Sequence, residues 1–234
     1  MRFHHIHFET IDSTMESARR EASGHDFLLI TAESQTHGRG TKGRAWQSPR
    51  GNIYFTVAVH RKFLPPERLQ LFPLEAGLSV WETVVESLPP ADRLNFRLKW
   101  PNDLLWKHRK TAGMLVETSG DHIFIGVGIN ISEAPEVKDG GTPSACLIEA
   151  GADPDCGLWL AEGFVENVQE RLSMTETPDV ASEWKAKALW DVSFRLRDRP
   201  DQPRVTPLDV NSDGHLRVRF EDGHEEFLVS EYLI

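Results

Sequence analysis

The chain has 234 residues with a formal net charge of −10, and 39% of its residues are hydrophobic, as in an ordinary globular protein. No apolar run approaches the ~20 residues that span a bilayer, and the start lacks a secretion signal, so we expect a cytoplasmic protein without a membrane partner. The acidic balance also argues against a general affinity for nucleic acid, because a polyanion would be repelled.

The first part of the chain predicts three strands and one helix around a long loop. Ser13 and Glu16 have the spacing of a capping box, which predicts a helix from Ser13 to about Ala22. Residues 34–52 lose hydrophobic periodicity and hold four glycines, and a loop of this length inside a compact domain is usually functional or disordered. We expect strands at residues 2–11, 27–31 and 53–60.

The rest of the chain predicts two long helices and more strands. Near residue 187 the pattern changes to short strands separated by turns. We expect helices at residues 66–88 and 154–172, the second with Pro154 near its first turn. Strands are expected at residues 94–100, 104–106, 111–117 and 122–131, with a hairpin turn at 107–110. Short strands between hairpin turns then predict a separate β module, with strands at residues 192–196, 205–210, 216–220 and 226–229. We therefore expect one domain at residues 1–187 and a small β module at 188–234, joined through residues 175–179.

The long loop contains the run Gly38-Arg39-Gly40-Thr41-Lys42-Gly43-Arg44-Ala45-Trp46. Glycines let the backbone approach a ligand closely, and arginines donate forked hydrogen bonds to phosphate or carboxylate. Residues 36–50 hold four basic residues and no acidic one, which indicates a local anionic ligand. The run matches neither common phosphate-binding loop, and by itself it is equally typical of a solvated linker.

Three further motifs place polar residues at strand ends. Pro101 keeps the preceding residue extended, so Asn102 and Asp103 would project at the mouth of the sheet, although a simple Asn-Asp turn explains them as well. Lys110 enters a buried strand ahead of small residues, where its ammonium could reach a ligand, but a surface hairpin lysine is more common. Residues 126–130 place two glycines and Asn130 on a strand, which favours close approach by a ligand or a kink of the sheet.

In their order and spacing these motifs resemble the biotin–protein ligase family. The loop at 38–54, the run Lys-Trp-Pro-Asn-Asp at 99–103, the strand at 110–117, the Gly-x-Gly-Ile-Asn run at 126–130 and an Asp-Ser-Thr opening at 12–14 all match. The resemblance implies an α+β fold: a mixed, largely antiparallel sheet flanked by helices, of the class II synthetase-like biotin/lipoate ligase type, followed by a small C-terminal β-barrel module. It also implies an ATP- and magnesium-dependent enzyme that forms biotinyl-5′-AMP and transfers biotin to a lysine of a carboxylase's biotin carboxyl carrier domain.

The resemblance assigns roles to matching residues. Biotin would be bound by Ser13, Thr14, Gln35, Gly38, Arg39, Gly40, Thr41, Lys110, Gly113 and Gly128. ATP and the adenylate would be bound by Arg39, Arg44, Trp46, Asn102, Asp103, Lys110 and Asn130. The expected catalytic residues are Lys110, Arg44 and Asp103, and Asp103 is also the expected ligand of Mg²⁺.

The sequence departs from the family pattern at one position. Where the family usually has a second arginine after Gly-Arg-Gly, which helps to hold the adenylate, this chain has Thr41 followed by Lys42. Family members that double as repressors carry an N-terminal helix-turn-helix domain. Here the Asp-Ser-Thr motif begins at residue 12, so we expect the form without that domain and no nucleic-acid partner.

Three alternatives compete with this interpretation. A lipoate- or octanoate–protein ligase shares the fold, but a fatty-acyl site would need apolar residues in place of Ser13, Thr14 and Gln35. A non-catalytic biotin-binding regulator would keep the pocket and lose the reaction, and Thr41 leaves this open. A nucleic-acid binder based on residues 39–50 is disfavoured by the net charge. A homodimer through an edge strand is not decided by the sequence.

Overall fold

The computed structural model describes residues 2–137, 141–174, 178–190, 192–229 and 233. Its centre is a seven-stranded sheet, in the order β1-β2-β3-β7-β6-β5-β4, in which β1 and β2 pair in parallel and the other neighbours pair antiparallel. The strands are β1 (His4–Ile11), β2 (Phe27–Gln35), β3 (Ile53–His60), β4 (Phe96–Lys99), β5 (Asp103–Trp106), β6 (Arg109–Ser119) and β7 (His122–Ile129). This mixed sheet confirms the expected fold class.

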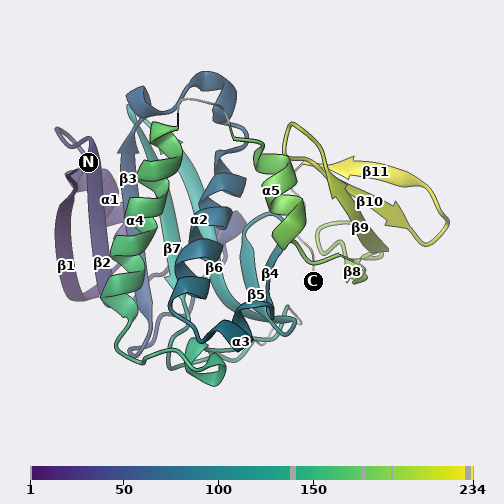
Figure 1. The fold of residues 1–234 in the computed structure, drawn as a ribbon, viewed down its shortest axis with the longest axis horizontal. Helices are drawn as coiled ribbons and strands as arrows, with labels where there is room; N and C mark the ends of the chain where they lie inside the picture. Colours follow the sequence, from purple (N-terminus) through teal and green to yellow (C-terminus); the bar gives the residue numbers. More distant parts are fainter. Residues whose placement is uncertain (1, 138–140, 175–177, 191, 230–232, 234) are drawn as a thin grey trace.

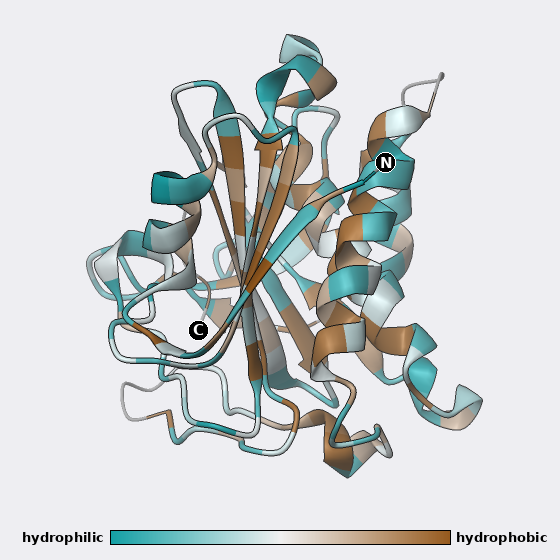
Figure 2. Cartoon of the chain, turned by 90° about the vertical axis from the view of Figure 1, so that its left-hand side faces the viewer, coloured by the Kyte–Doolittle hydropathy of each residue, from teal (hydrophilic) through white to brown (hydrophobic). Residues whose placement is uncertain are grey.

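Helices cover both faces of the sheet (Figure 1). On one face lie α2 (Phe72–Glu86) and α4 (Gly157–Ser173), which pack against each other as well as on the strands. On the other face lies α1 (Thr14–Glu21), against β2, β3 and β7. Figure 2 shows the hydrophobic residues concentrated in the strands and on the helix sides that face them. No helix of the described part is long and apolar enough to cross a membrane.

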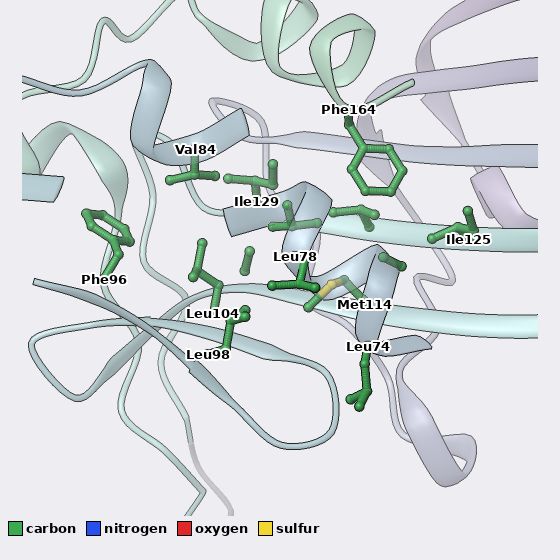
Figure 3. Packing of buried hydrophobic residues seen from close by; sticks show 14 of the residues in the cluster. Leu74, Leu78, Val84, Phe96, Leu98, Leu104, Met114, Ile125, Ile129 and Phe164 are labelled. Carbon is green, nitrogen blue, oxygen red and sulfur yellow. The ribbon is translucent and has the colours of Figure 1, made fainter. Parts of the chain in front are cut away.

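The alternation of side chains along the strands divides the interior into two cores. On β3, Phe55 and Val57 face α2 and α4, whereas Ala58 belongs to the smaller cluster around α1. In the larger core Leu78 of α2 and Phe164 of α4 lie close to residues of β6 and β7 (Figure 3). The core on the α1 face is the smaller of the two, and the pocket described below lies on this face.

A second, four-stranded antiparallel sheet follows at the C-terminal end, in the order β11-β10-β9-β8. Its strands are β8 (Phe194–Arg195), β9 (Arg204–Val210), β10 (Leu216–Phe220) and β11 (Glu225–Leu228). The hydrophobic core continues into it from the main sheet. Trp100, directly after β4, donates a 3.0 Å hydrogen bond from Nε1 to the carbonyl oxygen of Gly214 in this module. The boundary between residues 187 and 188 stays a proposal.

Several local predictions were wrong at the level of residues. The helix expected at 66–88 splits into a 3₁₀ turn at Pro66–Arg68 and α2, which has a proline in its first turn. Pro154 lies ahead of α4 and not in its first turn. Ser13 is the N-cap residue of α1 but its side chain makes no capping hydrogen bond. The joining segment 175–179 lies partly outside the described residues, and the helix α5 (Val180–Lys187) that follows it was not predicted.

The turn between β5 and β6 is also shorter than expected. Lys107 and His108 alone occupy it, both with positive φ (47° and 65°), and Lys110 belongs to β6. Its side chain is 17% exposed. Lys110 is therefore a strand residue and not a residue of a solvent-facing turn.

Candidate active site

A cavity of about 310 Å³ opens on the α1 face of the large sheet. Its walls come from the start of α1, the glycine- and arginine-rich loop, the middle of β6 and β7, and the segment that follows β7. Gly113 on β6 is paired with Gly128 on β7, and Gly126 lies on the same face two pairs further along, opposite Leu115. The three glycines leave their part of the cavity floor without side chains, next to Leu115.

Trp46 lies directly on this glycine floor. A Cβ atom added at Gly128 would be 2.5 Å from Trp46 Nε1, and one added at Gly113 would be 2.8 Å from Trp46 Cζ3. The close approach therefore requires glycine at both positions. Gly38 serves the loop itself, because an added Cβ would collide with the Trp46 carbonyl oxygen and with Ser48 Oγ. Gly38 is not among the residues that line the cavity, and its role in binding biotin stays a prediction.

The end of the cavity next to α1 is polar. Gln35 Oε1 accepts hydrogen bonds from the Thr14 backbone N–H at 2.9 Å and from Thr14 Oγ1 at 3.1 Å, and Thr56 Oγ1 donates to Thr14 Oγ1 at 3.0 Å. Ser13 is 2% exposed, and its Oγ has no hydrogen-bond partner among the described residues. A buried hydroxyl without a partner is costly, so this end is suited to a ligand with polar ring atoms.

The opposite end is charged. Lys110 Nζ lies 2.6 Å from Asp103 Oδ1 and 4.9 Å from the centre of the Trp46 ring. Behind it, Lys99 Nζ lies 3.8 Å from Asp103 Oδ2. Burial lowers the pKa of Lys99 to about 8, although the charge of Asp103 opposes this shift. Lys99 was not among the predicted site residues, because its sequence position does not reveal that it is buried.

Two arginines of the loop, Arg39 and Arg44, are bound to protein groups in this structure. Arg39 donates to Glu16 Oε1 at 2.6 Å and to Glu117 Oε1 at 3.1 Å. Arg44 donates to the Thr41 carbonyl oxygen at 3.1 Å and to Thr41 Oγ1 at 2.7 Å. The threonine that replaces the usual arginine thus orients the next arginine along the loop. Both arginines line the cavity, and their roles in binding biotin and the adenylate stay predictions.

The two asparagines have structural partners. Asn102 Nδ2 donates to the Met114 carbonyl oxygen at 2.6 Å, which ties the turn after β4 to β6. Asn130 Nδ2 donates to the Ala145 carbonyl oxygen at 3.2 Å, whereas its buried Oδ1 has no partner among the described residues. Both residues line the cavity, so contacts with a ligand are compatible with their positions.

The carboxylate of Asp103 fits poorly as a ligand of Mg²⁺. Both of its oxygens face ammonium groups, and the described residues contain no group of three metal-binding side chains. Magnesium binding at Asp103 stays a prediction.

The structure brings most of the predicted residues together. Cavity-lining residues that were predicted are Ser13, Thr14, Gln35, Arg39, Gly40, Thr41, Arg44, Trp46, Asn102, Lys110, Gly113, Gly128 and Asn130. Asp103 lies behind Lys110. Residues that were not predicted include Met15, Thr56, Gly126 and Thr142. The alternation along β3 and β7 could have found Thr56 and Gly126, which pair across the sheet.

Comparisons with known proteins agree on the class to which this fold and cavity belong. A model of the Biotin/lipoate A/B protein ligase family matches residues 7–130. The biotin--[acetyl-CoA-carboxylase] ligase of Mycobacterium tuberculosis is 33% identical over an alignment of 231 positions, which covers 95% of this chain and 84% of that protein. The chain therefore belongs to the biotin/lipoate protein ligase family.

Solved structures extend the likeness over nearly the whole chain. The biotin protein ligase of Leishmania major in complex with biotin is 32% identical with a TM-score of 0.73, over 98% of both chains. The biotin protein ligase of Aquifex aeolicus in complex with biotin and ATP is 25% identical with a TM-score of 0.77, over 99% of this chain and 97% of the other.

Proposed function

We propose that this protein is an ATP-dependent biotin–protein ligase that forms biotinyl-5′-AMP and transfers biotin to a lysine of a biotin carboxyl carrier domain. One observation carries the proposal: the cavity has a flat glycine floor between a polar end at Thr14 and Gln35 and a cationic end at Lys110. Biotin has the matching shape, with a polar ring system at one end and a carboxylate at the other. The relatives that this chain matches over most of its length are biotin ligases.

The first half-reaction brings two anions together. The biotin carboxylate attacks the α-phosphorus of ATP, giving biotinyl-5′-AMP and pyrophosphate. The enzyme accelerates this step by positioning and by fixed positive charge, and no covalent intermediate with the protein is required. Lys110 would offset the charge of the carboxylate and the α-phosphate, and Arg44 and Arg39 would close over the adenylate when the loop rearranges.

The second half-reaction needs a neutral amine. The ε-amino group of the carrier lysine attacks the acyl carbon of the mixed anhydride, AMP leaves, and the amine proton must be lost. Asp103 was predicted as a candidate base. Its carboxylate faces Lys110 and Lys99 in the resting protein, so we assign Asp103 the role of holding Lys110 in place. The positive charge of the cleft favours the neutral form of the carrier amine.

The remaining roles are proposals for matching residues. Ser13, Thr14 and Gln35 would bind the ureido ring, with Gly113 and Gly128 below the thiophene. Asn102 and Asn130 would lie along the nucleotide, and Trp46 would move from the glycine floor to cover the ligand. We place the reaction in the cytoplasm with no nucleic-acid partner. A homodimer would use the outer edge of β1, where the large sheet ends.

The closest alternative is a lipoate- or octanoate–protein ligase, since the family includes both activities. The polar end of the cavity favours biotin. The deciding measurement is exchange of labelled pyrophosphate into ATP with biotin, lipoate or octanoate as the acid. Exchange with biotin alone is expected. Exchange with a fatty acid alone would assign the protein to the sister activity, and no exchange together with tight biotin binding would favour a non-catalytic regulator.

A further inference from the structure

Lys99 is a buried lysine directly behind the cationic end of the cavity, at the last position of β4. Its side chain is 2% exposed, and its Nζ donates 2.7 Å hydrogen bonds to Thr142 Oγ1 and to the Leu233 carbonyl oxygen. A buried ammonium is costly unless hydrogen bonds and opposite charge compensate it. Here neutral oxygens fix its position, and Asp103 supplies the opposite charge from 3.8 Å away.

Asp103 is shared between two ammonium groups. Its Oδ1 pairs with Lys110 Nζ at 2.6 Å and its Oδ2 faces Lys99. Asp103 is itself 2% exposed, whereas Lys110 lines the cavity. Among these three side chains, two cations against one carboxylate leave one positive charge, and Lys110 is the member of the three that lines the cavity.

We propose that Lys99 is a positioning residue for the acid substrate: it neutralises Asp103, so that the charge of Lys110 stays available for the carboxylate of biotin. This inference rests on the proposed function. Without Lys99, Lys110 and Asp103 form a neutral pair. An entering carboxylate then meets the repulsion of Asp103 together with the attraction of Lys110, in a site where water screens neither charge well.

A purely structural role makes a different prediction. If Lys99 only ties residues 142 and 233 to β4, its loss loosens the cavity as a whole, and every ligand suffers alike. Charge balance, in contrast, acts on the carboxylate alone. Biotin and biotinamide differ in this group, because the amide carries no charge and keeps the ring system and the chain. The pair of ligands therefore separates the two roles.

The experiment is titration calorimetry of the full chain with biotin and with biotinamide, without ATP, so that no chemistry intervenes. Lys99→Met is expected to raise the Kd of biotin about tenfold or more, and to leave the Kd of biotinamide within about twofold. The double variant Lys99→Met/Asp103→Asn restores one positive charge and is expected to regain most of the lost biotin affinity. Lys62→Met is the matched control. Lys62 lies just beyond the end of β3 and also pairs with an aspartate, Asp26.

Other outcomes contradict the inference in distinct ways. Equal weakening of both ligands in Lys99→Met, unchanged binding of both, or a double variant no better than the single one would overturn it. If Lys99→Met does not fold, Lys99→Gln keeps a donor for the neutral oxygens and carries the same expectation. A wild-type protein that binds neither ligand would contradict the proposed function instead.

Discussion

Lys110 occupies a position that neither a turn residue nor a free surface lysine would have. It lies on β6, its Nζ contacts Asp103 and the Trp46 ring, and its backbone pairs with residue 144 on the segment after β7. The backbone is thus fixed from several sides, and the side chain contributes charge to the cavity. Function and stability can therefore be separated at this residue.

Lys110→Ala is expected to lower the rate of biotinyl-adenylate formation by at least about 100-fold, because it removes the cation that offsets the meeting of two anions. The free energy of unfolding should change by no more than about 2 kcal/mol, since Lys99 still compensates Asp103. Single-turnover adenylate synthesis and urea denaturation measure the two effects. A rate within a few-fold of the wild type would remove Lys110 from the reaction.

The lowered pKa of Lys99 predicts a pH-dependent stability. Its pKa is about 8 in the folded protein and about 10.4 in an unfolded chain, so between these values the unfolded state binds more protons and stability rises with pH. The unfolding free energy of the wild type minus that of Lys99→Met should therefore increase by about 2 kcal/mol from pH 7 to pH 9.5. Urea denaturation of both proteins at the two pH values tests the sign, and a constant or falling difference would contradict it.

At the scale of elements, the paired glycines of β6 and β7 determine where a flat ring can lie. Because Gly113 faces Gly128 across the two strands, the indole of Trp46 rests on backbone. A methyl group at either position would occupy the place of the indole or of a ligand ring. The two strands thus form the floor because their glycines carry no side chains.

Gly128→Ala should weaken biotin binding at least about tenfold, because the added Cβ lies 2.5 Å from Trp46 Nε1 and intrudes on the floor. Gly163→Ala is the matched control: it adds the same methyl group on α4, where the nearest atom, Thr83 Cγ2, lies at 3.4 Å. Titration calorimetry with biotin measures both variants. Equal affinities would mean that the ligand does not lie on this floor.

The sequence predicted elements well where a pattern is local. The expected bounds of β3 and β10 agree with the structure, because alternation and flanking turns define both strands. It missed α5, whose eight residues have few apolar anchors besides Val180 and Trp184.

In the site, the sequence motifs predicted which residues line the cavity but not which side chains and backbone groups they contact. Lys99 is surrounded by Thr142 and Leu233, which lie 43 and 134 positions further along the chain, and no local pattern encodes such contacts.

At the scale of the whole molecule, several described residues of the C-terminal module contact the site region. Trp100 donates to Gly214, Lys99 donates to Leu233, and Lys42, in the glycine- and arginine-rich loop, pairs with Asp198 in the turn between β8 and β9. The first two contacts hold the end of β4, and the third reaches the loop that lines the cavity. The module therefore positions parts of the site from outside the large sheet.

The pair between Lys42 and Asp198 predicts a local effect on the loop. Both side chains are more than two-fifths exposed (44% and 42%), so the pair contributes at most about 1 kcal/mol, and Asp198→Ala should leave global unfolding nearly unchanged. Opening the loop costs less free energy than unfolding the whole protein, so the loss of one ion pair affects it more. Asp198→Ala should therefore raise the rate of trypsin cleavage after Lys42 about two- to fivefold. Mass spectrometry of timed digests measures this rate. Asp213→Ala, which removes the same charge from another turn of the module, should cleave like the wild type; equal rates in the two variants would mean that the module does not restrain the loop.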